Sequence, residues 1–120
     1  MAVRADSRKH KRRCAEIPVR WTIDAQGREG EGMLLDISRT GARLRLTTDF
    51  DARGGATFGL RASTVPLLPR TARLRWFRRL PGRTPTYLCG VVFLQLGTNL
   101  EDWGEWLNAQ SDDELLKFAS

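Results

Sequence analysis

Alternation of apolar and polar residues limits the folds open to this chain of 120 residues more than any other feature. Ile17, Val19, Trp21 and Ile23 recur at every second position, a period typical of a strand with one buried face. We predict this strand over 17–23 and five further short strands over 33–37, 42–47, 57–62, 72–80 and 87–96. The intervening segments are rich in Gly, Pro and Asp, as turns are. The sequence therefore predicts a mainly β domain.

The pattern changes from strand to helix after residue 97. The apolar residues with helical spacing are Leu100, Trp103, Trp106 and Leu107. Thr98 with Glu101 three residues later predicts a capping box at the start of this helix, and residues 111–114 predict the cap of a second, short helix. We expect the helical aromatic side chains to pack against the strands. Six antiparallel strands followed by a helix indicate a small β-barrel or sandwich with a helix over one end.

The length fits one domain with a single core. We divide it into a basic N-terminal arm (1–16), a β-barrel (17–97) and a C-terminal helical segment (98–120). No apolar run approaches the ~20 residues of a membrane-spanning helix, and the N-terminus lacks the apolar region of a secretory signal. Cys14 and Cys89 match no metal-binding or redox spacing. We therefore expect a cytoplasmic protein with both thiols reduced.

The net charge of +6 is unevenly distributed. Residues 1–13 hold six basic residues and one acid, whereas residues 101–120 hold six acids and one lysine. A basic arm on a basic body favours a polyanionic partner such as a phosphate, a nucleic acid or a membrane surface, although such an arm can also serve only solubility. The opposite charges of the two ends lead to the hypothesis that the acidic tail folds back on the arm and competes with a ligand.

The segment from Asp36 to Gly41 lies between two predicted strands. Asp36 and Ser38 can bond their own backbone and stabilise a turn. Gly41 allows a positive φ or the close approach of a ligand. Taken alone, the segment is also what an ordinary hairpin turn looks like.

Two segments together resemble the PilZ family of bacterial cyclic di-GMP receptors. They are Arg8-Lys9-His10-Lys11-Arg12-Arg13, before the first predicted strand, and Asp36-Ile37-Ser38-Arg39-Thr40-Gly41. The family carries an RxxxR motif ahead of its first strand and a [DN]xSxxG motif after its second. Residues 88–94 resemble its closing strand, and Trp76 stands where a strand tryptophan is frequent. The resemblance covers about 8–107 and implies a six-stranded antiparallel β-barrel with a C-terminal helix.

The resemblance also implies a ligand site and a role. The implied ligand-binding residues are Arg8, Arg12, Arg13, Asp36, Ser38 and Gly41. Arginine can fork onto phosphate, pair with guanine and stack on a base, and Asp36 can accept hydrogen bonds from a guanine edge. The implied function is a signalling effector or adaptor that binds cyclic di-GMP as a ligand, holds no cofactor or metal, and acts on a downstream protein partner.

The RxxxR half allows a second interpretation. If the first strand begins at Ile17, Arg12 matches the first arginine of the motif and Glu16 stands at the second. A literal RxxxR spans Arg8 to Arg12, four residues earlier. Because a carboxylate repels phosphate, Glu16 leads to the alternative of a degenerate PilZ-like domain. Such a domain does not bind cyclic di-GMP and works as a protein–protein interaction adaptor.

Other function classes have less support in the sequence. Nucleic acid is not an expected partner, because Trp76 and Phe77 fall at expected core positions and leave no stripe of surface aromatics among basic residues. An enzyme is not expected either, because the only histidine, His10, lies in the arm and Asp36 and Ser38 have no general base beside them. No metal-ligand spacing and no Gly-rich phosphate loop is present.

Overall fold

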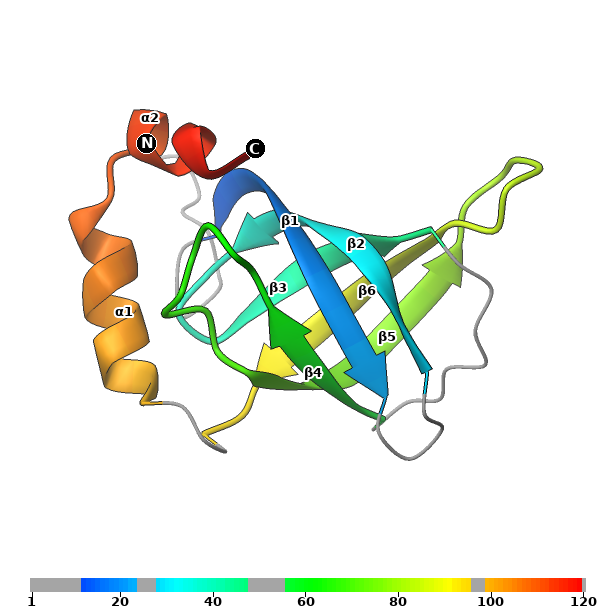
Figure 1. The fold of residues 1–120 in the computed structure, drawn as a ribbon, viewed down its shortest axis with the longest axis horizontal. Helices are drawn as coiled ribbons and strands as arrows, with labels where there is room; N and C mark the ends of the chain where they lie inside the picture. Colours follow the sequence, from blue (N-terminus) through cyan, green and yellow to red (C-terminus); the bar gives the residue numbers. More distant parts are fainter. Residues whose placement is uncertain (1–11, 24–27, 48–55, 96–98, 120) are drawn as a thin grey trace, which may run out of the picture.

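A computed structural model describes residues 12–23, 28–47, 56–95 and 99–119. Over these residues, six antiparallel strands close into a barrel in the order β1-β2-β3-β6-β5-β4 (Figure 1). The strands are β1 (Arg13–Ile23), β2 (Arg28–Ile37), β3 (Gly41–Leu46), β4 (Thr57–Arg61), β5 (Thr71–Arg79) and β6 (Tyr87–Phe93). The prediction of a mainly β, six-stranded antiparallel barrel is confirmed.

The predicted starts of the first two strands are wrong. β1 begins at Arg13 rather than Ile17, and β2 begins at Arg28 rather than Met33. The segment before Met33 contains three glycines and was therefore expected to be a turn. Two of these glycines make room for neighbouring strands: a Cβ on Gly30 would lie 2.8 Å from Trp21 Cζ2, and one on Gly32 would lie 2.6 Å from Leu46 Cδ2. Glycine serves strand packing here rather than turn formation.

The barrel core follows the predicted alternation. On β1, Ile17, Val19 and Trp21 point inward and are buried, while the residues between them are exposed or half-buried. Leu44 on β3 and Phe58 on β4 face the same interior. Because alternate residues of a strand lie on opposite faces, one run of apolar residues per strand suffices to fill a barrel of this size.

The aromatic residues of β5 depart from this rule. Leu74 is buried, but Trp76 and Phe77 are each 41% exposed, so their predicted core positions are wrong. The pairing of β5 with β6 shifts register between Leu74 and Trp76, which inserts an extra residue at this point. Such a bulge turns Trp76 outward. It does not explain the exposure of Phe77, which lies on the other face of β5, opposite the buried Cys89.

Two helices and a short 3-10 helix cover the end of the barrel. They are α1 (Leu100–Ala109), α2 (Asp112–Leu116) and η2 (Lys117–Ala119) (Figure 1). Asn99, not Thr98, caps α1: its Oδ1 accepts hydrogen bonds from the N–H groups of Glu101 (2.9 Å) and Asp102 (3.2 Å). Thr98 itself lies outside the described residues. The predicted cap at residues 111–114 is present at α2, where Ser111 and Glu114 form a capping box.

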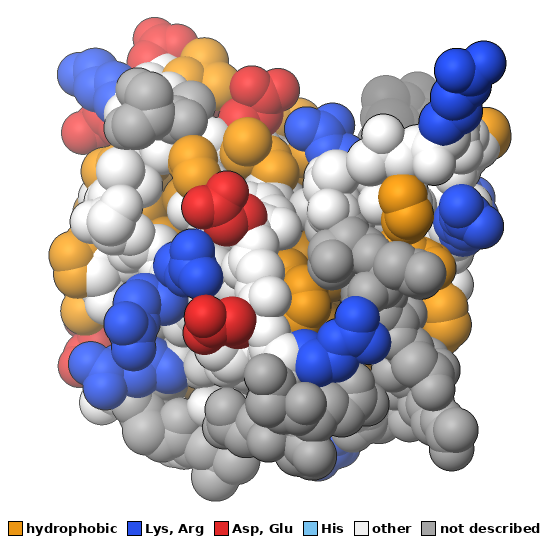
Figure 2. All heavy atoms as spheres, turned by 45° about the vertical axis from the view of Figure 1, so that its right-hand side comes forward, with side chains coloured by type: hydrophobic (Ala, Val, Ile, Leu, Met, Phe, Trp, Pro, Cys, Tyr) orange, Lys and Arg blue, Asp and Glu red, His pale blue; other side chains and the backbone are white. Residues whose placement is uncertain are grey.

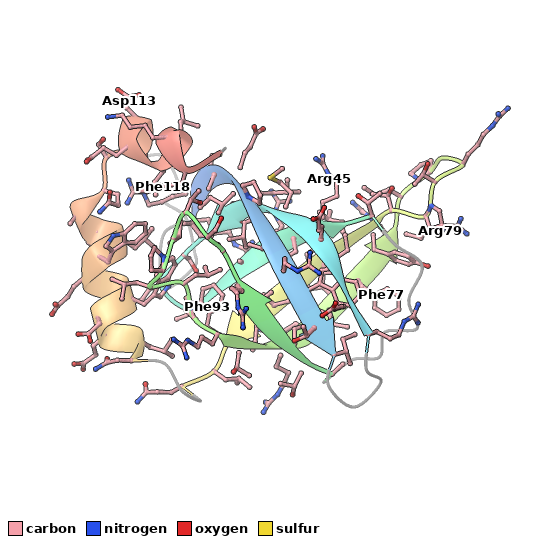
Figure 3. The ribbon with its side chains drawn as sticks, viewed as in Figure 1. Arg45, Phe77, Arg79, Phe93, Asp113 and Phe118 are labelled. Carbon is pink, nitrogen blue, oxygen red and sulfur yellow. The ribbon has the colours of Figure 1, made fainter. Side chains whose placement is uncertain are left out.

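The helical aromatic side chains pack inward, as predicted. Trp103 is buried, with its ring 5.8 Å from that of Phe93 on β6 and 5.5 Å from that of Trp106. Trp106 in turn lies 5.4 Å from Phe118, so a chain of rings joins the barrel to η2. Figure 3 labels the first and last of these rings, Phe93 and Phe118. None of the described helices combines the length and the apolar composition needed to cross a bilayer.

Candidate functional site

The turn between β2 and β3 is stabilised by the hydroxyl of Ser38. Ser38 Oγ accepts hydrogen bonds from the N–H groups of Thr40 (3.3 Å) and Gly41 (3.2 Å), and the Ser38 N–H donates to the Gly41 carbonyl (2.8 Å). Among the described residues only Gly82 has a positive φ, so conformational freedom does not explain Gly41. A Cβ on Gly41 would collide with the carbonyl oxygen of Val91, so glycine lets β3 approach β6.

One row of residues crosses five strands next to this turn. The registers place Cys14 opposite Asp36, Asp36 opposite Arg43, Arg43 opposite Gly90, and Gly90 opposite Trp76. Directly opposed residues of antiparallel strands point to the same face of the sheet. The row therefore places a thiol, a carboxylate, a guanidinium and an indole side by side on the outer wall of the barrel.

Bulges bring two members of this row outward. Leu34 and Asp36 are two residues apart and would share a face of a regular strand, yet Leu34 points into the core. The pairing of β2 with β3 shifts between these two residues, and the pairing of β5 with β6 shifts in the same way between Leu74 and Trp76. Bulges are frequent next to binding sites because they redirect single side chains.

Asp36 lies at the centre of the row and is held by two arginines. Its Oδ1 accepts a hydrogen bond from Arg12 Nη1 (3.0 Å), and its Oδ2 accepts one from Arg43 Nε (2.5 Å). The Asp36 side chain is 7% exposed, whereas those of Arg12 and Arg43 are 31% and 42% exposed. The buried carboxylate is thus neutralised by two cations that remain open to solvent on their other sides.

A cavity of about 330 Å³ opens over this row. Its lining residues are Arg12, Cys14, Asp36, Arg43 and Trp76. The Trp76 ring lies against the backbone of Gly90, where a Cβ would collide with the indole. Glycine at position 90 therefore allows the ring to form one wall. The cavity combines two guanidinium groups, an aromatic face and a carboxylate, which suits a ligand that is both anionic and planar.

Arg13 points the other way, toward the C-terminal helices. Its Nη1 donates to the carbonyl of Leu107 (2.6 Å), and its Nη2 donates to the carbonyl of Gln110 (2.5 Å) and to Oδ1 of Asp112 (3.0 Å). The Arg13 side chain is 14% exposed. A second cavity of about 440 Å³ lies here, bordered by Arg13, Arg39 and the end of α1. The contact with Asp112 agrees with the hypothesis that the acidic tail folds back on the arm.

The turn is also tied to α1. Trp103 Nε1 donates a hydrogen bond to the Ser38 carbonyl (3.3 Å). The Arg39 side chain lies across Gly104, where a Cβ would be 2.8 Å from the Arg39 Nε. Helix α1 therefore holds in place the turn that follows Asp36.

The structure brings together only part of the predicted site. Arg12 and Asp36 meet at the cavity, while Ser38 and Gly41 shape the adjoining turn. Arg13 faces a different cavity, and Arg8 lies outside the described residues. Sequence reasoning missed Arg43, Cys14 and the outward position of Trp76. The sequence did hold a signal for two of them: Arg43 is a polar residue on the outward face of β3, and Trp76 stands where a strand tryptophan is frequent. Only the strand register shows that both lie beside Asp36.

The start of β1 also changes the interpretation of Glu16. Placing Glu16 at the second arginine of RxxxR required a first strand that begins at Ile17. Because β1 begins at Arg13, Arg12 is the residue directly before the first strand, and the literal RxxxR from Arg8 to Arg12 ends there. Glu16 is exposed on β1 and does not line the cavity. The structure thus also fits the literal RxxxR from Arg8 to Arg12, and the replacement of a motif arginine by Glu16 stays a prediction.

The other ionisable side chains of the described residues indicate no reactive centre. Burial raises the pKa of the Cys89 thiol to about 12, so this cysteine is a core residue without nucleophilic character at neutral pH. In the part of the chain that the structure describes, no three His, Cys, Asp or Glu side chains gather as metal ligands.

Comparisons with known proteins identify relatives of this chain. The sequence model of the PilZ domain family matches residues 6–105. The PilZ domain of YcgR from Escherichia coli, solved with c-di-GMP, superposes with a TM-score of 0.62 at 18% identity, covering 85% of this chain and 88% of that one. The Bacillus subtilis inhibitor of motility MotI/DgrA superposes with a TM-score of 0.57 at 16% identity, covering 88% of this chain and 54% of that one. A search of curated protein sequences found no match.

Proposed function

Because the chain belongs to the PilZ family, we propose that it is a receptor for cyclic di-GMP and that the cavity beside Asp36 is its ligand site. The contact of Arg12 with Asp36 at 3.0 Å is the observation that carries the proposal. It joins the end of the RxxxR segment to the first residue of the [DN]xSxxG segment, which are 24 residues apart in the chain.

Each group that lines the cavity has a part in binding. Cyclic di-GMP offers phosphates with negative charge, and guanines with flat faces and N–H donors. The guanidinium groups of Arg12 and Arg43 fork onto phosphate or guanine acceptors. The Asp36 carboxylate accepts hydrogen bonds from the guanine N–H groups, and Trp76 stacks on a base. Binding exchanges the internal Arg–Asp contacts for contacts with the ligand, so the cavity need not bury an unpaired charge.

One observation favours a second candidate function. Asp36 is already satisfied by Arg12 and Arg43 without any ligand, so a ligand has to compete with two ion pairs that include one of 2.5 Å. A site closed in this way suits a degenerate PilZ-like domain that acts only as a protein–protein interaction adaptor. Both candidates share a downstream protein partner, and they differ in whether cyclic di-GMP controls it.

Calorimetric titration of the full chain with cyclic di-GMP separates the two candidates, with GTP as the control ligand. We expect saturable binding by the wild type, and affinity lowered by tenfold to a hundredfold in Arg12→Ala and Asp36→Ala, since a lost charged hydrogen bond costs ~1.5–3 kcal/mol. Arg20→Ala is the matched control, because Arg20 is an exposed β1 arginine that does not line the cavity. No binding by the wild type at high micromolar ligand would favour the adaptor.

Two further variants test the details of the site. Glu16→Arg should bind cyclic di-GMP as the wild type does, since Glu16 lies outside the cavity. An increase of tenfold or more would support the interpretation in which Glu16 replaces a motif arginine. Cys14 is exposed and lines the cavity, so bound ligand should slow its alkylation. Equal rates with and without ligand would place the ligand elsewhere.

A further inference from the structure

The hairpin of β5 and β6 carries a cluster of exposed arginines. We define it as residues 75–87 and call it the arginine hairpin. It extends beyond the other strands at the end of the barrel away from α1 and α2 (Figure 1). Its exposed arginines are Arg75, Arg78, Arg79 and Arg83. It has no acidic residue, and residues 52–100 as a whole contain eight arginines and no Asp or Glu.

Unlike several arginines elsewhere on the barrel, these four have no carboxylate partner among the described residues. Arg12, Arg13 and Arg43 each contact a carboxylate, and Arg20 lies 3.5 Å from Glu31. Within the described ranges, no acidic side chain pairs with an arginine of the hairpin. The corner at the upper right of Figure 2 accordingly shows basic and hydrophobic side chains and no acidic ones. Four guanidinium groups therefore remain available to an external anion.

Exposed aromatic rings stand among these arginines. The order along β5 is Arg75-Trp76-Phe77-Arg78-Arg79. Phe77 is 41% exposed although its ring lies 6.0 Å from that of Tyr87. Trp76 belongs to the Asp36 cavity, whereas Phe77 does not line it. Figure 3 shows Phe77 and Arg79 at the same end of the barrel.

The positive charge of the arginine hairpin, taken alone, has a simpler explanation, because basic side chains keep the exposed edge of a sheet from pairing with another chain. That explanation does not require arginine rather than lysine, nor large aromatic rings exposed to water. Guanidinium groups that bond phosphates, together with rings on which bases stack, are the combination that binds single-stranded nucleic acid. We propose that the arginine hairpin binds single-stranded RNA or DNA.

This proposal does not depend on cyclic di-GMP binding. Phe77, Arg78 and Arg79 lie outside the Asp36 cavity, so a defect in one site leaves the other intact. The structure also removes the sequence argument against nucleic acid, which assumed that Trp76 and Phe77 lie in the core. An acidic protein would contact the arginines but would not need to contact Phe77. Substitution of Phe77 therefore distinguishes the two kinds of partner.

The first experiment measures fluorescence anisotropy of labelled single-stranded oligonucleotides, RNA and DNA, on titration with the full chain. Arg78→Ala/Arg79→Ala is compared with Arg20→Ala/Arg61→Ala, which removes the same charge from exposed positions on β1 and β4. We expect the hairpin pair to lower affinity at least tenfold. It should also flatten the slope of log K against log salt by about 1.4, at ~0.7 per lost phosphate contact. Equal losses in both pairs would mean that only net charge acts, and would overturn the proposal.

The second experiment tests the aromatic ring. Phe77→Ala should lower affinity by about tenfold without changing the salt slope, whereas Phe77→Tyr should bind as the wild type does, since it keeps the ring. A thermal melt of each variant checks that the barrel is folded. Poly-L-glutamate is the competitor of matched charge. Two results together would make the proposal fail and identify the hairpin as a surface for acidic proteins. Poly-L-glutamate would displace the labelled oligonucleotide as effectively as unlabelled oligonucleotide does, and Phe77→Ala would bind like the wild type.

Discussion

Arg12 and Arg13 are neighbours in the sequence but belong to two different regions of the molecule. Arg12 reaches Asp36 in the cavity on the barrel wall, and Arg13 reaches the end of α1. Adjacent residues of an extended chain point to opposite faces, so two neighbouring arginines contact different regions of the molecule. Residue type in a basic cluster therefore does not assign a role, whereas the face of the strand does.

The partners of the two arginines differ in whether a ligand can replace them. Arg12 shares a side-chain carboxylate with Arg43, and phosphate oxygens can take the place of that carboxylate. Arg13 bonds two backbone carbonyls at the end of α1, a helix with no basic residue in its own last turn. A cation is favourable at a helix C-terminus, so Arg13 supplies from the barrel what α1 lacks. We therefore expect Arg12 to govern affinity and Arg13 to govern stability.

The largest effect that tests this comparison is on stability. Arg13→Ala removes the donor to the Gln110 carbonyl and one of the two donors to the Leu107 carbonyl. We expect it to lower the free energy of unfolding by about 2–3 kcal/mol. Arg12→Ala should cost less than about 1 kcal/mol, because Arg43 still holds Asp36. Urea unfolding measures both. The assignment of roles would be reversed if Arg13→Ala were as stable as the wild type but had lost cyclic di-GMP binding.

A pair of tryptophans extends the same contrast. Trp76→Ala should lower ligand affinity by about tenfold through lost stacking and change stability little. Trp106→Ala should leave affinity unchanged and weaken the packing of Phe118 against α1. Calorimetry and thermal melts give the two readouts, and Trp76→Phe is the control that retains a ring. Equal losses of affinity in both alanine variants would show that the two regions act as one.

The contact of Asp112 with Arg13 tests competition between the acidic tail and the ligand. Asp112 is 84% exposed, so Asp112→Asn should lower stability by less than about 1 kcal/mol. If the tail restrains the arm, the same variant should bind cyclic di-GMP up to several-fold more tightly. Asp113→Asn is the matched control, since Asp113 is an exposed neighbour that makes no contact with Arg13 among the described side chains. Identical affinities of the two variants would end the hypothesis of competition.

The smallest predicted effect is the pH dependence of the α2 cap. The hydrogen bond from the backbone N–H of Ser111 lowers the pKa of Glu114 below its ordinary value of 4.5. Because the folded-state pKa lies below the unfolded-state value, the cap contributes stability above pH 4.5 and loses it as the pH falls through the lowered pKa. Thermal melts should therefore show a smaller drop on acidification for Glu114→Gln than for the wild type. Parallel curves would mean that the carboxylate contributes nothing to the cap.

Much of the fold could be predicted because it depends on local pattern. The inward faces of β1 and β3 follow from a period of two, and the cap of α2 follows from Ser111 and Glu114 three residues apart. The resemblance that named Arg12 and Asp36 also rests on short segments. Local signals failed where a residue makes room for a distant one. The glycines before Met33 suggest a turn, but Gly30 accommodates Trp21 of β1 and Gly32 accommodates Leu46 of β3.

The barrel, its helical end and the two motif segments can be predicted from the sequence, because strand period, helix spacing and turn chemistry are properties of neighbouring residues. Which side chains share a face depends on how the strands pair. Bulges turn Asp36 and Trp76 outward, strand register sets Arg43 beside Asp36, and the start of β1 assigns Arg12 and Arg13 to separate regions. Register and bulges arise from pairing between strands that are far apart in the chain, and for this reason no single segment contained the site.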